Sequence, residues 1–295
     1  MAAGSRRASR SGQLLRRAPE QRPGRPPPRP GRRSELRGRI LVAAPALALV
    51  AVVVWRGGLL FALALLVVGC VCLHELYQLT ARSRPARLAG FAALLALLIA
   101  AHYGGRDQML LVAVAALPVT FLVTIASPAG SAYGIAATLL GVWWIGLPLA
   151  HAVLLRGLPH GGGIVVDVLV GTFVGDTGAY LGGRGFGRRA LAPQISPNKT
   201  VEGLVIGIAC AIVAVWFASL YQPWLPKGDA ILLGLGVAIA APIGDLFESY
   251  LKRQTGVKDS GRAFGVHGGA LDRLDAVLFT AVVGYYIWLA ILGVR

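Results

Sequence analysis

The stretch SYLKRQTGVKDSGRAFGVHGGALDRLDA, residues 249–276, gathers Lys, Arg, Asp and His side chains in a chain that is otherwise mostly apolar. The chain has 295 residues, of which 56% are hydrophobic and only 14% are charged. A soluble domain has a smaller apolar fraction and about 25% charged residues. The stretch therefore marks the place where a largely membrane-embedded chain would keep its chemistry.

The rest of the sequence predicts an all-α polytopic integral membrane protein. Several apolar runs approach the roughly 20 residues that a helix needs to cross a bilayer. A β-barrel is disfavoured because the runs are continuous rather than alternating. We expect about nine transmembrane segments, at 40–55, 58–80, 88–103, 108–126, 133–155, 163–182, 203–222, 230–248 and 274–294.

The positive charges orient these segments. Cytoplasmic loops of membrane proteins carry an excess of Lys and Arg, so we expect a cytoplasmic N-terminus and, after nine segments, an external C-terminus. With this orientation the cytoplasmic parts hold 24 of the 29 Lys and Arg residues. These parts are the N-terminal tail and the loops 81–87, 127–132, 183–202 and 249–273.

Residues 1–39 are predicted to be a disordered, basic cytoplasmic tail, because they are rich in Arg, Pro, Gly and Ser and have little to bury. The net charge of +16 would also suit a nucleic-acid partner. No aromatic residues interleave with the arginines, however, so we expect the bilayer and its anionic headgroups as partner and no nucleic acid. We divide the remainder into N-terminal transmembrane helices, 40–160, and a C-terminal catalytic region, 161–295.

Carboxylates within membrane segments are costly and are candidates for function. Asp245, Glu248 and Ser249 share one helix face because they are spaced i, i+3, i+4. Asp272 and Asp275 are three residues apart at the start of the last segment. Both helix ends meet the same cytoplasmic loop, so their oxygens could hold a divalent cation. The alternative is that each acid pairs with a nearby Lys or Arg.

Basic and glycine residues accompany the acids in the two long loops. Lys and Arg beside carboxylates suit a metal-bound polyphosphate, because the metal bridges phosphate oxygens and the cations neutralise the remaining charge. The glycines after His267 would let backbone N–H groups approach a phosphate. The alternative for a basic cytoplasmic loop is topology alone, and Arg188 and Arg189 are assigned to it. The sequence contains no Walker A motif.

The spacing of these residues resembles a known family. The pattern S-x-L-K-R at 249–253, K-D-x-G at 258–261 and H-G-G-x-x-D-R-x-D at 267–275 is similar to that of phosphatidate cytidylyltransferases, the CDP-diacylglycerol synthases. Two upstream blocks resemble the family too, GDTGAYLGGRGFGRR at 175–189 and SPNKTVEG at 196–203. The chain departs from the family where Gly265-Val266 replaces the usual Pro-Gly, where Asn198 replaces a common Lys and where Ala276 replaces a common Ser.

The resemblance implies a nucleotidyltransferase of phospholipid biosynthesis at the cytoplasmic face of the plasma membrane. Its substrates would be CTP and phosphatidic acid, and its products CDP-diacylglycerol and pyrophosphate. It further implies Mg²⁺ and allows a second, monovalent cation and a homodimer. Two alternatives stay open: another CTP-dependent lipid enzyme, such as a polyprenol-type kinase or an ether-lipid cytidylyltransferase, and an ion-coupled transporter.

The motif positions receive roles from the same resemblance. The Mg²⁺ ligands would be Asp245, Asp272 and Asp275. The catalytic group would be Asp245, Asp272, Lys258, Asp259, His267 and Arg273. Substrate phosphates would contact Lys199, Ser196, Asn198, Lys252, Arg253, Gly268 and Gly269. The site would be supported by Asp176, Glu248 and Ser249.

Overall fold

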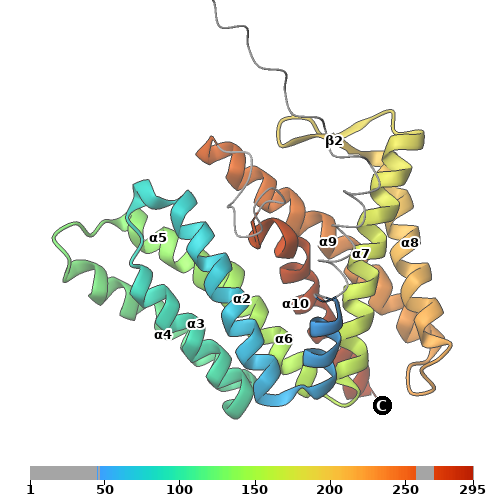
Figure 1. Ribbon diagram of the computed structural model, residues 1–295, viewed down its shortest axis with the longest axis horizontal. Helices are drawn as coiled ribbons and strands as arrows, with labels where there is room; N and C mark the ends of the chain where they lie inside the picture. The colour runs from blue at the N-terminus through green and yellow to red at the C-terminus, as the bar shows by residue number, and fades with distance from the viewer. Residues whose placement is uncertain (1–44, 46, 257–268, 295) are drawn as a thin grey trace, which may run out of the picture. The chain divides into compact units, whose positions relative to one another are not determined.

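The computed structural model describes residues 45, 47–256 and 269–294, and nearly all of them are helical (Figure 1). The predicted tail at 1–39 lies outside these residues. Eight described helices are long and apolar enough to cross a membrane, and a shorter helix, Leu47–Arg56, falls in the first predicted segment. The chain is therefore an all-α, multi-pass membrane protein, as predicted.

The helices follow the predicted apolar runs closely. They are α2 (Gly58–Leu79), α3 (Arg87–Ile99), α4 (Arg106–Ile125), α5 (Ala132–Gly141), α6 (Leu147–Gly157), α7 (Gly161–Phe186), α8 (Val201–Ser219), α9 (Lys227–Thr255) and α10 (Leu271–Val294). The π-helical turn Ala100–Gly104 continues α3, and the turn Val142–Gly146 joins α5 to α6. The fifth predicted segment is thus one apolar helix, Ala132–Gly157.

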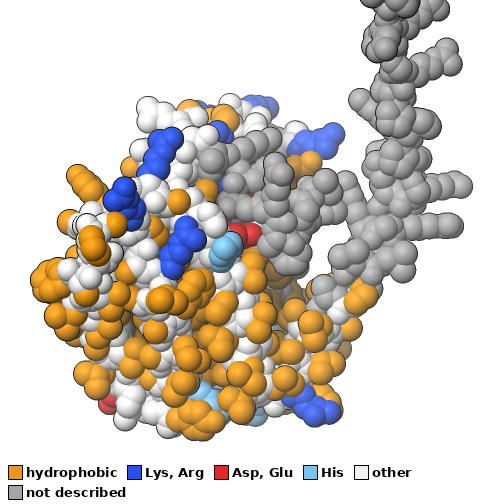
Figure 2. Space-filling view, turned by 60° about the vertical axis from the view of Figure 1, so that its left-hand side comes forward, with side chains coloured by type: hydrophobic (Ala, Val, Ile, Leu, Met, Phe, Trp, Pro, Cys, Tyr) orange, Lys and Arg blue, Asp and Glu red, His pale blue; other side chains and the backbone are white. Residues whose placement is uncertain are grey.

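The surface has the distribution of side chains that a bilayer favours. Figure 2 shows a broad band of hydrophobic side chains, with Lys and Arg side chains gathered mainly above it. Large apolar residues on the outward faces of α4 and α8 are exposed, as Val114 and Val205 illustrate. Because each helix satisfies its own backbone hydrogen bonds, such a face can meet lipid without cost.

Helices α7 and α8 pack with their backbones close together. A Cβ atom at Gly203 would lie 2.6 Å from the carbonyl oxygen of Ala179, and one at Gly207 would lie 2.8 Å from that of Gly175. Lipid tails are as apolar as leucine, so helices in a membrane associate through close packing at small residues rather than through hydrophobicity. These two glycines therefore place α7 beside α8.

The loops differ from the prediction in their extent. Helix α9 continues through 249–255, beyond the predicted end at 248, and stops at Gly256, which has a left-handed φ of 73°. Its last turn carries Lys252 and Arg253, which the negative end of the helix dipole favours. Helix α10 begins at Leu271 rather than 274. The range 183–202 holds the end of α7, a hairpin and the start of α8.

The hairpin consists of two short strands, β1 (Ala190–Ala192) and β2 (Ser196–Thr200), which pair antiparallel. In Figure 1 it lies at the same end of the helices as the C-terminal end of α9 and the start of α10. The predicted site residues on these elements are thus gathered at one end of the transmembrane helices. That this end faces the cytoplasm stays a prediction.

Candidate active site

A cluster of five carboxylates and two lysines lies where α7, α9, α10 and β2 meet. It joins elements that are far apart in the sequence, and its basic members are held by acidic ones. We call it the carboxylate cluster. Its members are Asp176 on α7, Lys199 on β2, Asp245, Glu248 and Lys252 on α9, and Asp272 and Asp275 on α10.

Lys252 connects α9 to α10. Its Nζ lies 2.6 Å from Oε2 of Glu248 and 2.8 Å from Oδ1 of Asp272. The Glu248 side chain is only 3% exposed, and taking a carboxylate out of water is costly unless a cation accompanies it. One ammonium group therefore lies between two carboxylates at this end of the site and offsets part of their charge.

Lys199 likewise provides a positive charge beside Asp245. The two side chains form an ion pair between β2 and α9, and the Ser249 hydroxyl donates to Oδ1 of Asp245 at 3.5 Å. Asp176 and Asp275 both lie within electrostatic range of Asp245 and Lys199. Asp275 lies within electrostatic range of Glu248 as well, so Asp245 is linked to Asp272 through Asp275, Glu248 and Lys252.

Close contact between α9 and α10 places the acids side by side. A Cβ atom at Gly244 would overlap the carbonyl oxygen of Asp275 and lie 3.0 Å from Cα of Ala276. Glycine at this position lets the two backbones approach where Asp245 and Asp275 project. Asp275 is buried, and its Oδ1 accepts a 2.7 Å hydrogen bond from the Ala276 amide.

The hairpin is attached to the end of α9 by side chains. Arg253 Nε donates to the Ile195 carbonyl at 3.2 Å, next to the strand that carries Lys199. The Thr200 hydroxyl accepts a 3.1 Å hydrogen bond from the Gly203 amide and so caps α8. Such an N-cap satisfies one of the free amides of a helix start. It therefore fixes the point at which the chain passes from β2 into α8.

The cluster offers the oxygen donors that a hard divalent cation prefers. Oε1 of Glu248 is buried and has no hydrogen-bond partner among the described residues. In the described part of the chain, no three His, Cys, Asp or Glu side chains form a ready-made metal site. The ammonium groups of the cluster lie against carboxylates, Lys199 at Asp245 and Lys252 at Glu248 and Asp272.

The remaining predicted residues fall into two groups. Ser196 and Asn198 lie on β2 beside Lys199, Arg273 is exposed on the first turn of α10, and the Gly269 amide donates to Oδ2 of Asp272 at 2.7 Å. The predictions for Lys258, Asp259, His267 and Gly268 lie outside the described residues.

Two buried acids have partners that the sequence did not indicate. Glu75 on α2 accepts hydrogen bonds from the amides of Ala270 and Leu271, at the start of α10. The only indication of Glu75 in the sequence is that it is a lone acidic residue in an apolar segment. Asp167 lies apart from the cluster and accepts a 2.9 Å hydrogen bond from Gln222.

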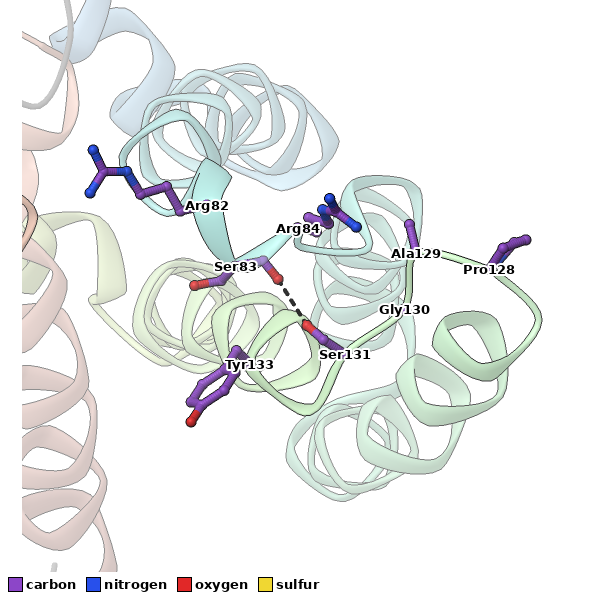
Figure 3. Close-up of a pocket in the computed structure, with 8 residues that line it drawn as sticks. All are labelled: Arg82, Ser83, Arg84, Pro128, Ala129, Gly130, Ser131 and Tyr133. Carbon is purple, nitrogen blue, oxygen red and sulfur yellow. Dashed lines mark hydrogen bonds between the residues drawn. The ribbon is translucent and has the colours of Figure 1, made fainter.

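A cavity of about 450 Å³ lies elsewhere, between the loops that join α2 to α3 and α4 to α5 (Figure 3). The Ser131 hydroxyl donates to the Ser83 carbonyl at 3.2 Å across it, while the side chains of Arg82 and Arg84 point away from each other. No member of the carboxylate cluster lines it. The lining residues are Arg82, Ser83, Arg84, Pro128, Ala129, Gly130, Ser131 and Tyr133.

Comparison with known proteins places the chain in a family. Residues 37–291 match the model of a family described as the cytidylyltransferase family. The chain belongs to the cytidylyltransferase family. The match includes every residue of the carboxylate cluster, and it confirms the resemblance expected from the motif at 249–275.

Individual relatives agree with this assignment. The chain is 34% identical to a phosphatidate cytidylyltransferase of Brucella suis over 85% of its own length and 93% of that protein. It is 38% identical to a phosphatidate cytidylyltransferase of Mycobacterium leprae, over 50% of the chain and 48% of that protein. It is 37% identical to the uncharacterized protein YnbB of Escherichia coli, over 56% and 57%. The chain thus spans about half the length of the last two relatives.

Proposed function

We propose that the chain is a phosphatidate cytidylyltransferase, which converts CTP and phosphatidic acid to CDP-diacylglycerol and pyrophosphate. The observation that carries the proposal is the carboxylate cluster, in which Lys252 bridges Glu248 and Asp272 at the ends of two membrane helices. A site of alternating acids and bases suits two polyanionic reactants. The names of the Brucella and Mycobacterium relatives support the same activity.

The reaction joins two phosphate groups. An oxygen of the phosphatidic acid phosphate attacks the α-phosphorus of CTP, a new P–O bond forms, and the bond from the α-phosphorus to the bridging oxygen breaks. The electron pair leaves with pyrophosphate. Since the attacking phosphate is already anionic, no general base is needed, and positioning and charge neutralisation should dominate the catalysis.

The carboxylates and lysines divide this work. Asp245, Asp272 and Asp275 would hold Mg²⁺, which when bound neutralises phosphate oxygens. The carboxylates released from Lys252 and Lys199 would then be compensated by the cation, and the two ammonium groups would turn to phosphates. Two ammonium groups face five carboxylates in the cluster, so its formal charge is −3 before any substrate is present, and a divalent cation would reduce this excess of negative charge.

Further phosphate contacts are proposed for residues near these lysines. Arg253 and Arg273 lie on the helix turns next to the cluster, and Ser196 and Asn198 share β2 with Lys199. The Gly269 amide, at the start of α10, lies where a helix favours an anion. The roles of Lys258, Asp259, His267 and Gly268 remain those predicted from the motif.

The position of the cluster at helix ends suits a lipid substrate. The headgroup of phosphatidic acid would lie at the membrane surface while its acyl chains stay in the bilayer between helices. We place this surface on the cytoplasmic side of the plasma membrane, where the Lys and Arg bias puts the loops. A homodimer and a second, monovalent cation are expected from the family resemblance alone.

The decisive experiment uses purified protein, phosphatidic acid and CTP labelled in turn at the cytidine and at the γ-phosphate, with and without Mg²⁺. Retention of labelled cytidine in a lipid product supports cytidylyl transfer. Transfer of only the γ-phosphate would identify a lipid kinase instead. A matched reaction with an ether-linked lipid acceptor separates the remaining alternative. Absence of any lipid product with all acceptors would refute the proposed activity.

A further inference from the structure

Glu75 joins the N-terminal helices to the first turn of α10. The residue lies on α2 and is only 4% exposed. Its Oε1 accepts a 3.1 Å hydrogen bond from the Ala270 amide, and its Oε2 accepts a 2.9 Å hydrogen bond from the Leu271 amide. Both oxygens of one buried carboxylate are therefore directed at two consecutive N–H groups of another helix.

These N–H groups are ones that a helix cannot satisfy by itself. The first amides of an α-helix have no intrahelical acceptor, and the helix dipole makes this end attractive to a negative charge. Helix α10 begins at Leu271. The preceding amide of Gly269 donates to Oδ2 of Asp272 at 2.7 Å. Three consecutive amides are thus held by two carboxylates, those of Glu75 and Asp272.

The contact has a direct consequence for Asp272. This residue follows Leu271 in the chain, so the position of the Leu271 amide determines where the Asp272 side chain leaves α10. Lys252 holds the other oxygen of Asp272, at 2.8 Å. Cys72, one turn before Glu75 on α2, lies within electrostatic range of both Glu75 and Glu248, so α2 runs beside the carboxylate cluster.

We propose that Glu75 is a positioning residue, which holds the start of α10 and through it places Asp272 for the reaction. A role as a metal ligand is less consistent with its geometry, because both oxygens face backbone amides. The link to catalysis rests on the proposed function, whereas the hold on α10 does not. The N-terminal helices would thereby contribute to a site whose motif residues all lie after residue 160.

The test compares the full-length protein with Glu75→Gln, Glu75→Asp and Glu75→Ala. Glutamine keeps one acceptor oxygen but turns an NH₂ group toward a backbone N–H. Hydrogen–deuterium exchange should show that the amides at 269–271 are protected in the unchanged protein. The amides of 270 and 271 should exchange about 10- to 100-fold faster in the Gln and Ala variants. The Mg²⁺ concentration for half-maximal activity should rise by about 10- to 100-fold, with partial recovery in the Asp variant.

Thr172→Val is the matched control. The Thr172 hydroxyl donates to that of Thr280 at 3.0 Å, a buried contact of the same helix α10 further along its length. This variant should lower thermal stability but leave both the exchange at 269–271 and the Mg²⁺ requirement unchanged.

Three results would overturn the inference. One is rapid exchange at 270 and 271 in the unchanged protein, which needs no variant to fold. Another is an exchange rate in Glu75→Gln equal to that of the unchanged protein. The third is a loss of stability in the Glu75 variants with the Mg²⁺ requirement unaltered, as in the control. If the unchanged protein forms no lipid product, the proposed function fails, but the exchange measurement still tests the hold on α10.

Discussion

Replacing Gly244 by alanine tests whether the approach of α9 to α10 builds the site. The added methyl group would overlap the Asp275 carbonyl oxygen and lie 3.0 Å from Cα of Ala276. Both obstacles are backbone atoms of a helix, so they can yield only if the helices separate. Overpacking of this kind costs about 1–3 kcal/mol, and we expect the upper part of this range.

Gly236→Ala is the matched comparison on the same pair of helices. Its methyl group would meet Cδ1 of Ile287, the far end of a flexible side chain, and lie 3.1 Å from Cγ1 of Val283. Both substitutions gain about 1 kcal/mol of helix propensity, so the difference between them reports the obstruction. A difference of about 2 kcal/mol in the free energy of unfolding corresponds to a Tm difference of roughly 4–8 °C for a chain of this size.

The assay combines thermal unfolding in detergent with the rate of CDP-diacylglycerol formation. A shift of about 1 Å between reacting groups can lower a rate about 100-fold, so Gly244→Ala should lose activity by about this factor even below its Tm. Gly236→Ala should retain most of its activity. Equal Tm values and equal rates for the two variants would refute the reasoning, since the approach at Gly244 would then have no special importance.

Three further substitutions address the charges of the cluster. Lys252→Met removes the ammonium group that Glu248 and Asp272 share. The change should destabilise the protein by about 3–5 kcal/mol and lower its Tm. An unchanged Tm would show that the two carboxylates do not need this ammonium group. Asp272→Asn should reduce cytidylyl transfer at least about 100-fold while membrane insertion persists, and full activity in purified protein would remove Asp272 as a ligand. Lys199→Ala should reduce turnover far more than Arg188→Ala, and equal losses would mean that bulk charge matters rather than placement.

The eight long transmembrane helices could be predicted because their apolar runs are long and uniform. Their ends were harder to place, since a charged turn can remain helical when its side chains find partners. At the end of α9, Lys252 binds two carboxylates and Arg253 reaches the hairpin, so the helix continues to Thr255. The hairpin was missed because its strands are only three and five residues long, and Pro197 within β2 argues against a strand.

The site was predictable to the extent that it follows local spacing. The i, i+3, i+4 pattern places Asp245, Glu248 and Ser249 on one face of α9, and the same rule joins Glu248 to Lys252. Contacts between helices do not follow from spacing. The hydrogen bond between Glu75 and Leu271 joins residues 196 positions apart. A single sequence does not indicate to which helix N-terminus a lone buried acid will bind.

The narrow seam between α7 and α8 limits how this chain can vary. An exchange of Gly203 or Gly207 for leucine would make the helix more hydrophobic and leave its insertion into a bilayer intact. The same exchange would force α8 away from α7, and β2 with Lys199 would move with the start of α8. A variant chosen by hydropathy alone would therefore insert into the membrane normally. Its Lys199, however, would no longer lie against Asp245.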